Sequence, residues 1–279
     1  MKKIQLTLSV FIVLVCSNTI CAQTKISWNI TAGTSLPIGS FAKMDYDHNT
    51  GVTDCALFDS DKNGGASIGI NAGISALIPL KSDKISASLS ADIHYNGVNS
   101  NTKSYLSDIC NLLANNWGQS IINGGDHLLS SYCTLDRKPS YFNIPIMIGI
   151  HYCSPLSNGM KLFGECGLGL NMIFIQSWKL TGVQKYIFSS YSEDTWLQVN
   201  GVFSYESNSA FAFKIGTGLF ISDNLFLSVY YYYLGKSDVS CKIKSTWSGE
   251  YVSPNTSSQY MNLGTVTPSI LSVKLGYSF

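Results

Sequence analysis

The strongest constraint on this chain is an alternation of apolar and polar residues that recurs over segments of ten or more positions. In KISASLSADIHYNG (84–97), Leu89, Ile93 and Tyr95 fall on one face of an extended chain. Ser90 and Asp92 fall on the other face. A period of two is the signature of a β-strand whose two faces meet different surroundings. The pattern recurs at 25–37, 66–80, 140–152, 160–174, 209–221, 224–235 and 268–279, which makes eight predicted strands.

The surroundings of the apolar faces are predicted to be lipid. A soluble β-sandwich also alternates, but these strands reach the length of about 9–11 residues that crosses a bilayer at a tilt. Short turns at 79–84, 154–159 and 222–224 alternate with long segments at roughly 37–66, 97–140, 177–208 and 235–267. Only 13% of the residues are charged, about half the usual quarter. The sequence therefore predicts an all-β fold, an eight-stranded antiparallel transmembrane β-barrel with short periplasmic turns and four long extracellular loops.

The N-terminal segment predicts export. MKK is followed by IQLTLSVFIVLV, which suits the apolar core of a signal peptide. This run is too short for a spanning helix, which takes about 20 apolar residues. We place the signal peptide at 1–22 and the barrel domain at 23–279, with lipidation at Cys16 or Cys21 as the weaker alternative. The predicted location is the outer membrane, and a net charge of +1 argues against a nucleic-acid partner.

Cysteines in an exported chain can form disulfides. Six remain after the predicted cleavage: Cys55, Cys110, Cys133, Cys153, Cys166 and Cys241. None of them has the C-x-x-C spacing of a metal or redox site. Cys110 and Cys133 share one long segment and could pair, but the sequence leaves the pairing of the set open.

Four stretches carry a resemblance to a known family: SLPIGSFAK, YFNIPIMIGIHY, the glycine-rich LFGECGLGL and the C-terminal LSVKLGYSF. In this order they resemble the small outer-membrane β-barrel proteins of Bacteroidetes, a family of OmpA-like barrels that includes relatives of the gliding and secretion protein PorT. The resemblance implies a barrel in the outer membrane. It also implies that Tyr277 and Phe279 belong to an assembly signal read by the outer-membrane insertion machinery. LSVYYYYLG lacks the Arg-Tyr often found there, so no role of that arginine carries over.

The barrel interior is the first candidate site. By the parity of the alternation, six ionisable side chains point inward: Asp92, His94, His151, Glu165, Lys214 and Lys274. The interior of an eight-stranded barrel is just filled by side chains and buried charges must pair, so we expect a salt-bridged polar plug and no porin channel. The alternative is a lipid-modifying enzyme that uses His94 with Ser90 and Asp92. These residues are spaced about 7 Å apart along one strand, whereas a nucleophile needs its base within about 3 Å, so we predict no enzyme.

The first long segment holds a partial calcium motif. In DSDKNG, Asp59, Asp61 and Asn63 have the spacing of calcium-loop ligands. The twelfth position, where a bidentate glutamate belongs, is Ile70. A polar turn-rich loop explains the same residues. We therefore predict no cofactor, with weak Ca²⁺ binding at this loop as the alternative.

The second long segment has apolar residues near helical spacing: Leu106, Ile109, Leu112, Leu113 and Trp117. A short amphipathic helix fits this pattern and could lie over the barrel mouth or on the membrane surface. A loop that packs its own side chains is the preferred interpretation.

The predicted function is that of a structural or interaction protein that presents its loops at the cell surface for adhesion or binding. Aromatic residues in the long segments, among them Trp178, Trp196 and Trp247, could contact a surface protein or a glycan. The alternative, implied by the resemblance, is a component of a transport or secretion assembly, and the lipid-modifying enzyme comes third. The other expected partners are the bilayer and the insertion machinery.

Overall fold

The structure of the 279-residue chain is a computed structural model, which describes residues 26–44, 64–80, 84–119, 127–156, 159–187, 194–249 and 254–279. The predicted signal peptide, 1–22, lies outside the described residues. The elements in chain order are β1 (Ser27–Pro37), η2 (Gly39–Ala42), β2 (Gly69–Pro79), β3 (Ile85–Asn96), α2 (Ser100–Gln119), β4 (His127–Arg137), β5 (Tyr141–Pro155), β6 (Lys161–Ile175), β7 (Trp178–Ile187), β8 (Asp194–Tyr205), β9 (Asn208–Phe220), β10 (Leu225–Tyr233), β11 (Ser237–Gly249), β12 (Asn255–Val266) and β13 (Ser269–Ser278).

Eight strands form a closed antiparallel barrel in the order β1-β13-β10-β9-β6-β5-β3-β2. These are the eight strands that the alternation predicts, so the predicted fold class is confirmed. The last strand closes on the first: Trp28 N–H donates to the Phe279 carbonyl at 3.0 Å, and Phe279 N–H donates to the Trp28 carbonyl at 2.9 Å. Closure leaves no unpaired edge on the barrel, which would be costly in lipid.

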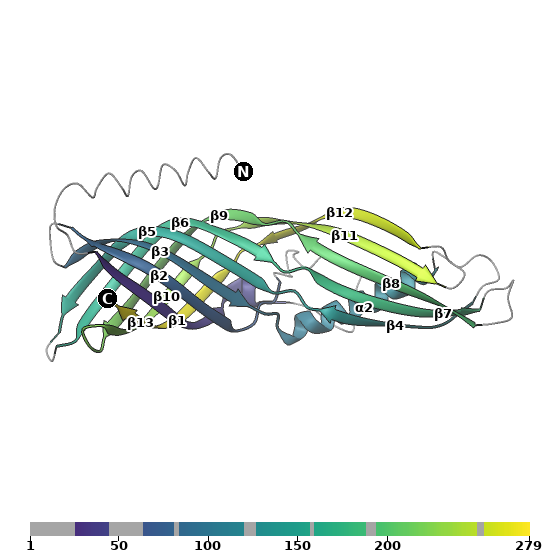
Figure 1. Ribbon diagram of the computed structural model, residues 1–279, viewed down its shortest axis with the longest axis horizontal. Helices are drawn as coiled ribbons and strands as arrows, with labels where there is room; N and C mark the ends of the chain where they lie inside the picture. Colours follow the sequence, from purple (N-terminus) through teal and green to yellow (C-terminus); the bar gives the residue numbers. More distant parts are fainter. Residues whose placement is uncertain are drawn as a thin grey trace.

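A second sheet continues the barrel on the side away from the C-terminus (Figure 1). Its order is β12-β11-β8-β7-β4, and these strands adjoin β13, β10, β9, β6 and β5 in sequence. Segments expected to be loops therefore contain five strands that the sequence analysis missed. The period of two is interrupted there by register shifts, such as those between Asp238 and Ser240 and between Leu135 and Arg137. We call the two ends of the barrel the sheet end and the turn end.

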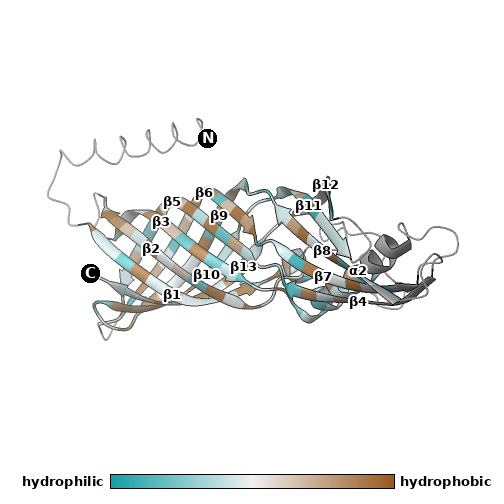
Figure 2. Cartoon of the chain, turned by 45° about the vertical axis from the view of Figure 1, so that its right-hand side comes forward, coloured by the Kyte–Doolittle hydropathy of each residue, from teal (hydrophilic) through white to brown (hydrophobic). Residues whose placement is uncertain are grey.

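The polarity of the wall reverses between the barrel and the second sheet. On β6 the outward Leu168 is 55% exposed, while the inward Glu165 is buried. On β7, Lys179 is exposed outward and its neighbours Trp178 and Leu180 are buried. Apolar residues alternate with more polar ones along the barrel strands (Figure 2). Since soluble proteins rarely expose apolar patches above a few hundred Å², the barrel wall faces lipid, and the second sheet has the outward polarity of a surface in water.

The second long segment forms a helix, so the preferred loop interpretation was wrong and the helical alternative holds. α2 begins where the Asn99 side chain caps it, accepting the Thr102 N–H at 2.9 Å. Its buried residues Tyr105, Leu106 and Ile109 join the core under the second sheet. The side chains of Leu112, Leu113 and Trp117 lie outside the described residues. Within the described ranges, no helix combines the length and hydropathy needed to cross a bilayer.

A disulfide fixes α2 to the edge of this sheet. Cys110, buried on the helix, is bonded to Cys133 on β4. This is the pairing that the sequence left open. Cys153, Cys166 and Cys241 are free thiols, and Cys55 lies outside the described residues.

Aromatic rings close the turn end of the barrel by packing over glycines of neighbouring strands. A Cβ added to Gly276 would lie 2.1 Å from Phe226 Cζ, and one added to Gly218 would lie 2.3 Å from Phe163 Cζ. The rings of Phe163 and Phe226 also pack against each other, with centroids 5.6 Å apart. The two glycines are therefore required by the close approach of these rings.

Candidate functional site

The six ionisable residues predicted to point inward are all buried in the barrel. The first ion pair joins β13 to β3: Lys274 Nζ lies 2.5 Å from Asp92 Oδ1. Lys274 also donates to the Tyr232 hydroxyl on β10 at 2.8 Å, and that hydroxyl donates to Asp92 Oδ2 at 2.9 Å. Three strands are thus tied together across the lumen.

The second ion pair joins β9 to β6. Lys214 Nζ lies 2.7 Å from Glu165 Oε1 and donates to the Ser90 hydroxyl on β3 at 2.8 Å. The Tyr230 hydroxyl donates to Glu165 Oε2 at 2.7 Å. Tyr230 also connects the two pairs, because its ring lies 5.2 Å from Lys214 Nζ and 5.3 Å from Lys274 Nζ.

We call this group the ionic plug; it consists of Asp92, Glu165, Lys214, Lys274, Tyr230 and Tyr232. It holds two cations and two carboxylates, so its formal charge is balanced. The four charged side chains are at most 5% exposed. A buried ion that lost its partner would cost several kcal/mol, so the members of the plug hold one another in place.

The two histidines lie beside the plug. His94 Nδ1 is 3.5 Å from the Ser35 hydroxyl, and its ring meets Tyr232 edge to face with centroids 4.7 Å apart. His151 stacks on Phe163 with centroids 4.9 Å apart. Among the described residues, no hydrogen bond joins Ser90 to His94: Ser90 accepts from Lys214, and the hydroxyl within hydrogen-bond distance of His94 Nδ1 is that of Ser35.

The plug is one of several layers that fill the lumen. Phe163, Phe220 and Phe226 pack together at the turn end. Towards the sheet end, Asn171 Nδ2 donates to Asn143 Oδ1 at 3.0 Å. An apolar core follows; it includes Phe41, Tyr105, Leu106, Ile109, Tyr141, Ile173, Ile175, Trp178, Leu234, Val239, Val266 and Ile270. The cavity beside the plug has a volume of about 20 Å³, little more than one water needs.

One of the aromatic residues considered for partner binding, Trp178, lies in the core of the second sheet. The Trp178 ring stacks on Phe203 at 3.8 Å, and its Nε1–H donates to the Tyr205 hydroxyl at 2.7 Å. Burial raises the pKa of Tyr205 well above its usual value and raises the pKa of the Cys241 thiol to about 12. Trp178 is therefore a core residue in this structure.

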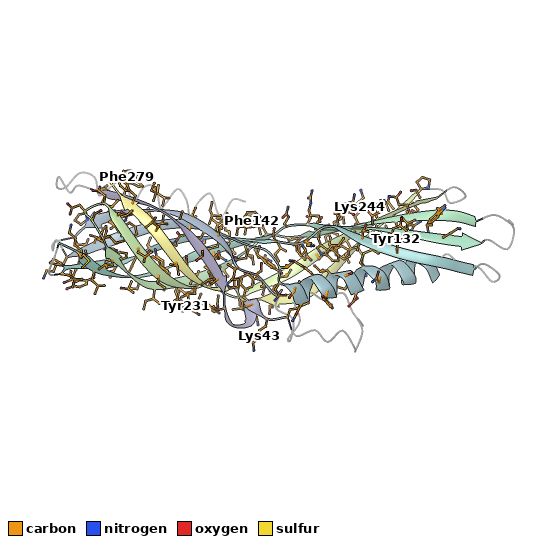
Figure 3. All side chains as sticks on the ribbon, turned by 90° about the horizontal axis from the view of Figure 1, so that it is seen from below. Lys43, Tyr132, Phe142, Tyr231, Lys244 and Phe279 are labelled. Carbon is orange, nitrogen blue, oxygen red and sulfur yellow. A yellow bond between two sulfur atoms is a disulfide. The ribbon has the colours of Figure 1, made fainter. Side chains whose placement is uncertain are left out.

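Other aromatic residues stand on the outward face of the second sheet. Tyr132, Trp196 and Tyr260 are 55%, 50% and 65% exposed. Lys185 Nζ lies 5.7 Å from the centroid of the Trp196 ring. Tyr132 lies in the half of the molecule opposite to Phe279 (Figure 3). Trp247 is partly buried.

The remaining predicted sites have separate positions. Tyr277 and Phe279 stand at the turn end, 47% and 60% exposed, with ring centroids 6.3 Å apart. Asp59, Asp61 and Asn63 lie outside the described residues, so the weak calcium site stays a prediction. Within the part of the chain that is described, no group of three or more His, Cys, Asp or Glu could hold a metal ion.

Sequence reasoning missed Tyr230 and Tyr232, which complete the plug. A signal was present, because YYYY places two tyrosines on each face of a strand. The sequence does not show what the inward pair contacts. Closure of the barrel brings β10 near the carboxylates of β3 and β6, and these become the hydrogen-bond partners of the two tyrosines.

Comparison with known proteins gives a family match. The family model for the outer membrane protein beta-barrel domain matches residues 21–238. Among curated proteins, none matches the sequence.

Solved structures to which the chain is similar include two outer membrane proteins and one surface protein. OprG from Pseudomonas aeruginosa is 14% identical with a TM-score of 0.36, over 92% of this chain and 97% of that one. Neisserial surface protein A is 9% identical with a TM-score of 0.35, over 91% and 99%. AlkL is 11% identical with a TM-score of 0.35, over 93% and 92%. At these scores no functional argument rests on them, and the likeness to PorT relatives stays a prediction.

Proposed function

Because the chain belongs to the outer membrane protein beta-barrel domain family, we propose that it is a closed outer-membrane anchor whose extracellular sheet binds a partner at the cell surface. The C-terminus and the short turns then face the periplasm, and the second sheet faces outward, as is usual for such barrels.

The observation that carries the proposal is the filled lumen. An aqueous channel needs a continuous polar path, but the ionic plug spans the barrel and apolar layers lie on both sides of it. The side chains that would have to move are held by two ion pairs and by two tyrosine hydroxyls. This arrangement favours an anchor over a pore.

The extracellular sheet supplies the second support. Its core is ordered by α2 and the disulfide between Cys110 and Cys133. Exposed aromatic side chains are common at the centres of binding surfaces, and Tyr132 and Trp196 are both at least half exposed on this face. These two residues are the part of the sheet that we assign to partner binding.

Planar-bilayer recording tests the anchor. The purified full chain should give no discrete channel openings, while a known porin in the same bilayers does. Stepwise conductance, together with uptake of small sugars by vesicles, would replace the anchor by a transporter.

Screening of glycans and surface proteins against the full chain in lipid nanodiscs tests the binding role. A bound partner should be lost with the double variant Y132S/W196S and kept with T134S, a change on the same face that removes no aromatic ring. Equal binding by both variants would exclude this face.

A further inference from the structure

At the sheet end of the barrel, the outward side chains change from aromatic to basic. Phe142, Phe174 and Tyr233 are the last outward-facing aromatic residues of β5, β6 and β10. Such residues form the girdle where the hydrocarbon ends. The basic residues that come next, in the direction of the second sheet, lie three to five sequence positions from these aromatic residues: Arg137, Lys138, Lys179 and Lys236. At about 3.3 Å per residue along a tilted strand, these cations stand in the headgroup zone.

Strand register brings further cations into line with these. Arg137 on β4 pairs with Lys179 on β7, Lys179 pairs with Val202 on β8, and Val202 pairs with Lys244 on β11. With strands about 4.8 Å apart, three cations span roughly 15 Å of the outward face. Lys242 lies on the same strand face, two residues from Lys244. Lys244 lies beyond Phe142 on the side away from Phe279 (Figure 3).

We call these six residues the basic collar: Arg137, Lys138, Lys179, Lys236, Lys242 and Lys244. All six are exposed. Among the residues that the structure describes, the acidic ones on the same outward zone are Asp136, Glu206 and Asp238, so the six cations of the collar face three described carboxylates.

Most of the collar has no ion-pair partner within the described part of the chain. Lys179 forms an ion pair with Asp136 at 3.7 Å, and Lys242 Nζ lies 5.2 Å from the Tyr260 ring centroid. No ion pair with a described residue involves Arg137, Lys138, Lys236 or Lys244. A chain of net charge +1 therefore concentrates positive charge at the outer boundary of its apolar wall.

We propose that the basic collar binds the phosphate groups of a phosphorylated glycolipid in the outer leaflet. Two observations select this ligand. The collar continues directly from the apolar wall, so the acyl chains and the phosphates of one lipid can contact both surfaces at once. Its charge is also complementary, since lysine and arginine near a membrane surface attract anionic headgroups and arginine binds phosphate through two parallel hydrogen bonds. A soluble anion would contact the cations of the collar but would have no acyl chains to place against the apolar wall.

The test is native mass spectrometry of the full chain in a neutral detergent, titrated with bisphosphorylated lipid A and with its dephosphorylated form. The phosphorylated lipid should bind at least tenfold more tightly, and binding should weaken as salt screens the charges. The variant R137Q/K179Q/K236Q should bind it at least tenfold more weakly. The matched variant K84Q/K161Q/K185Q removes the same number of charges, two at the turn end and one on β7 away from the barrel, and should stay within twofold of the native chain.

Three results would overturn the proposal. The two variants could bind equally, which would show that net charge alone attracts the lipid. The dephosphorylated lipid could bind as tightly as the phosphorylated one, which would leave only the acyl chains. Inorganic phosphate at millimolar concentration could displace the lipid, which would make the collar a site for free anions. The gel-mobility shift between unboiled and boiled samples confirms that each variant is folded before it is titrated.

Discussion

Removal of one partner from the ion pair between Asp92 and Lys274 should cost far more stability than removal of both. In K274M the Asp92 carboxylate loses a cation at 2.5 Å and keeps the hydrogen bond from the Tyr232 hydroxyl. The carboxylate is almost completely buried, so water cannot replace the ammonium group. Breaking a buried pair in this way costs about 3–5 kcal/mol. The double variant D92N/K274M leaves no unpaired charge and should recover most of that loss.

Urea unfolding in lipid vesicles, followed by the mobility of unboiled samples on a gel, measures these differences. The matched control is K161M, which breaks a pair with Asp223 at 3.5 Å where the two side chains are 44% and 89% exposed. Such a surface pair is worth less than about 1 kcal/mol. The reasoning would be refuted if K274M cost no more than K161M, or if the loss in the double variant equalled the sum of the single losses.

Three further changes test the glycine contacts, the disulfide and the buried thiol. Gly276→Ala should lower the free energy of unfolding by about 1–3 kcal/mol, because its Cβ collides with the aromatic ring above it; Gly164→Ala, where the nearest atom is 3.9 Å away, should be near neutral in the same urea titration. The C110A/C133A variant should destabilise the second sheet by about 3 kcal/mol, since the bond closes a loop with a sequence separation of 23, and with that sheet facing outward as proposed, protease on intact cells should then cut α2; an unchanged digestion pattern would contradict this. The Cys241 thiol, with its pKa raised to about 12, stays protonated at pH 8, so iodoacetamide should label it only after unfolding when the other free cysteines are replaced; rapid labelling of the folded chain would show that the thiol is accessible.

The barrel could be predicted from the sequence because lipid imposes a simple rule on every spanning strand. Leu89 and Ile93 must face hydrocarbon and Asp92 must not, and that rule is written locally as a period of two. The same parity, read along each strand separately, directs Glu165, Lys214 and Lys274 to the interior as well. The number of barrel strands and the side of each residue are therefore properties of the sequence alone.

The pairing inside the barrel was decided by closure. Asp92 and Lys274 are 182 positions apart, and nothing in their local sequence says that Lys274 selects Asp92 while Lys214 selects Glu165. The order of strands around the barrel and their stagger bring each cation to its carboxylate. The same holds for Tyr230 and Tyr232, whose role depends on which strands stand across the lumen.

The second sheet was also decided in three dimensions. In water the outward face of a strand needs only to be polar, so Ser, Thr and Lys on β11 resemble a loop until β8 and β12 are seen beside them. Bulges interrupt the remaining alternation in these strands. The helix α2 is identified by the apolar side chains that it buries under the second sheet. Lipid constrains each spanning strand individually, so every such strand shows the alternation in its own sequence. The second sheet and the basic collar depend on which strands pair side by side, and only the tertiary structure specifies that pairing.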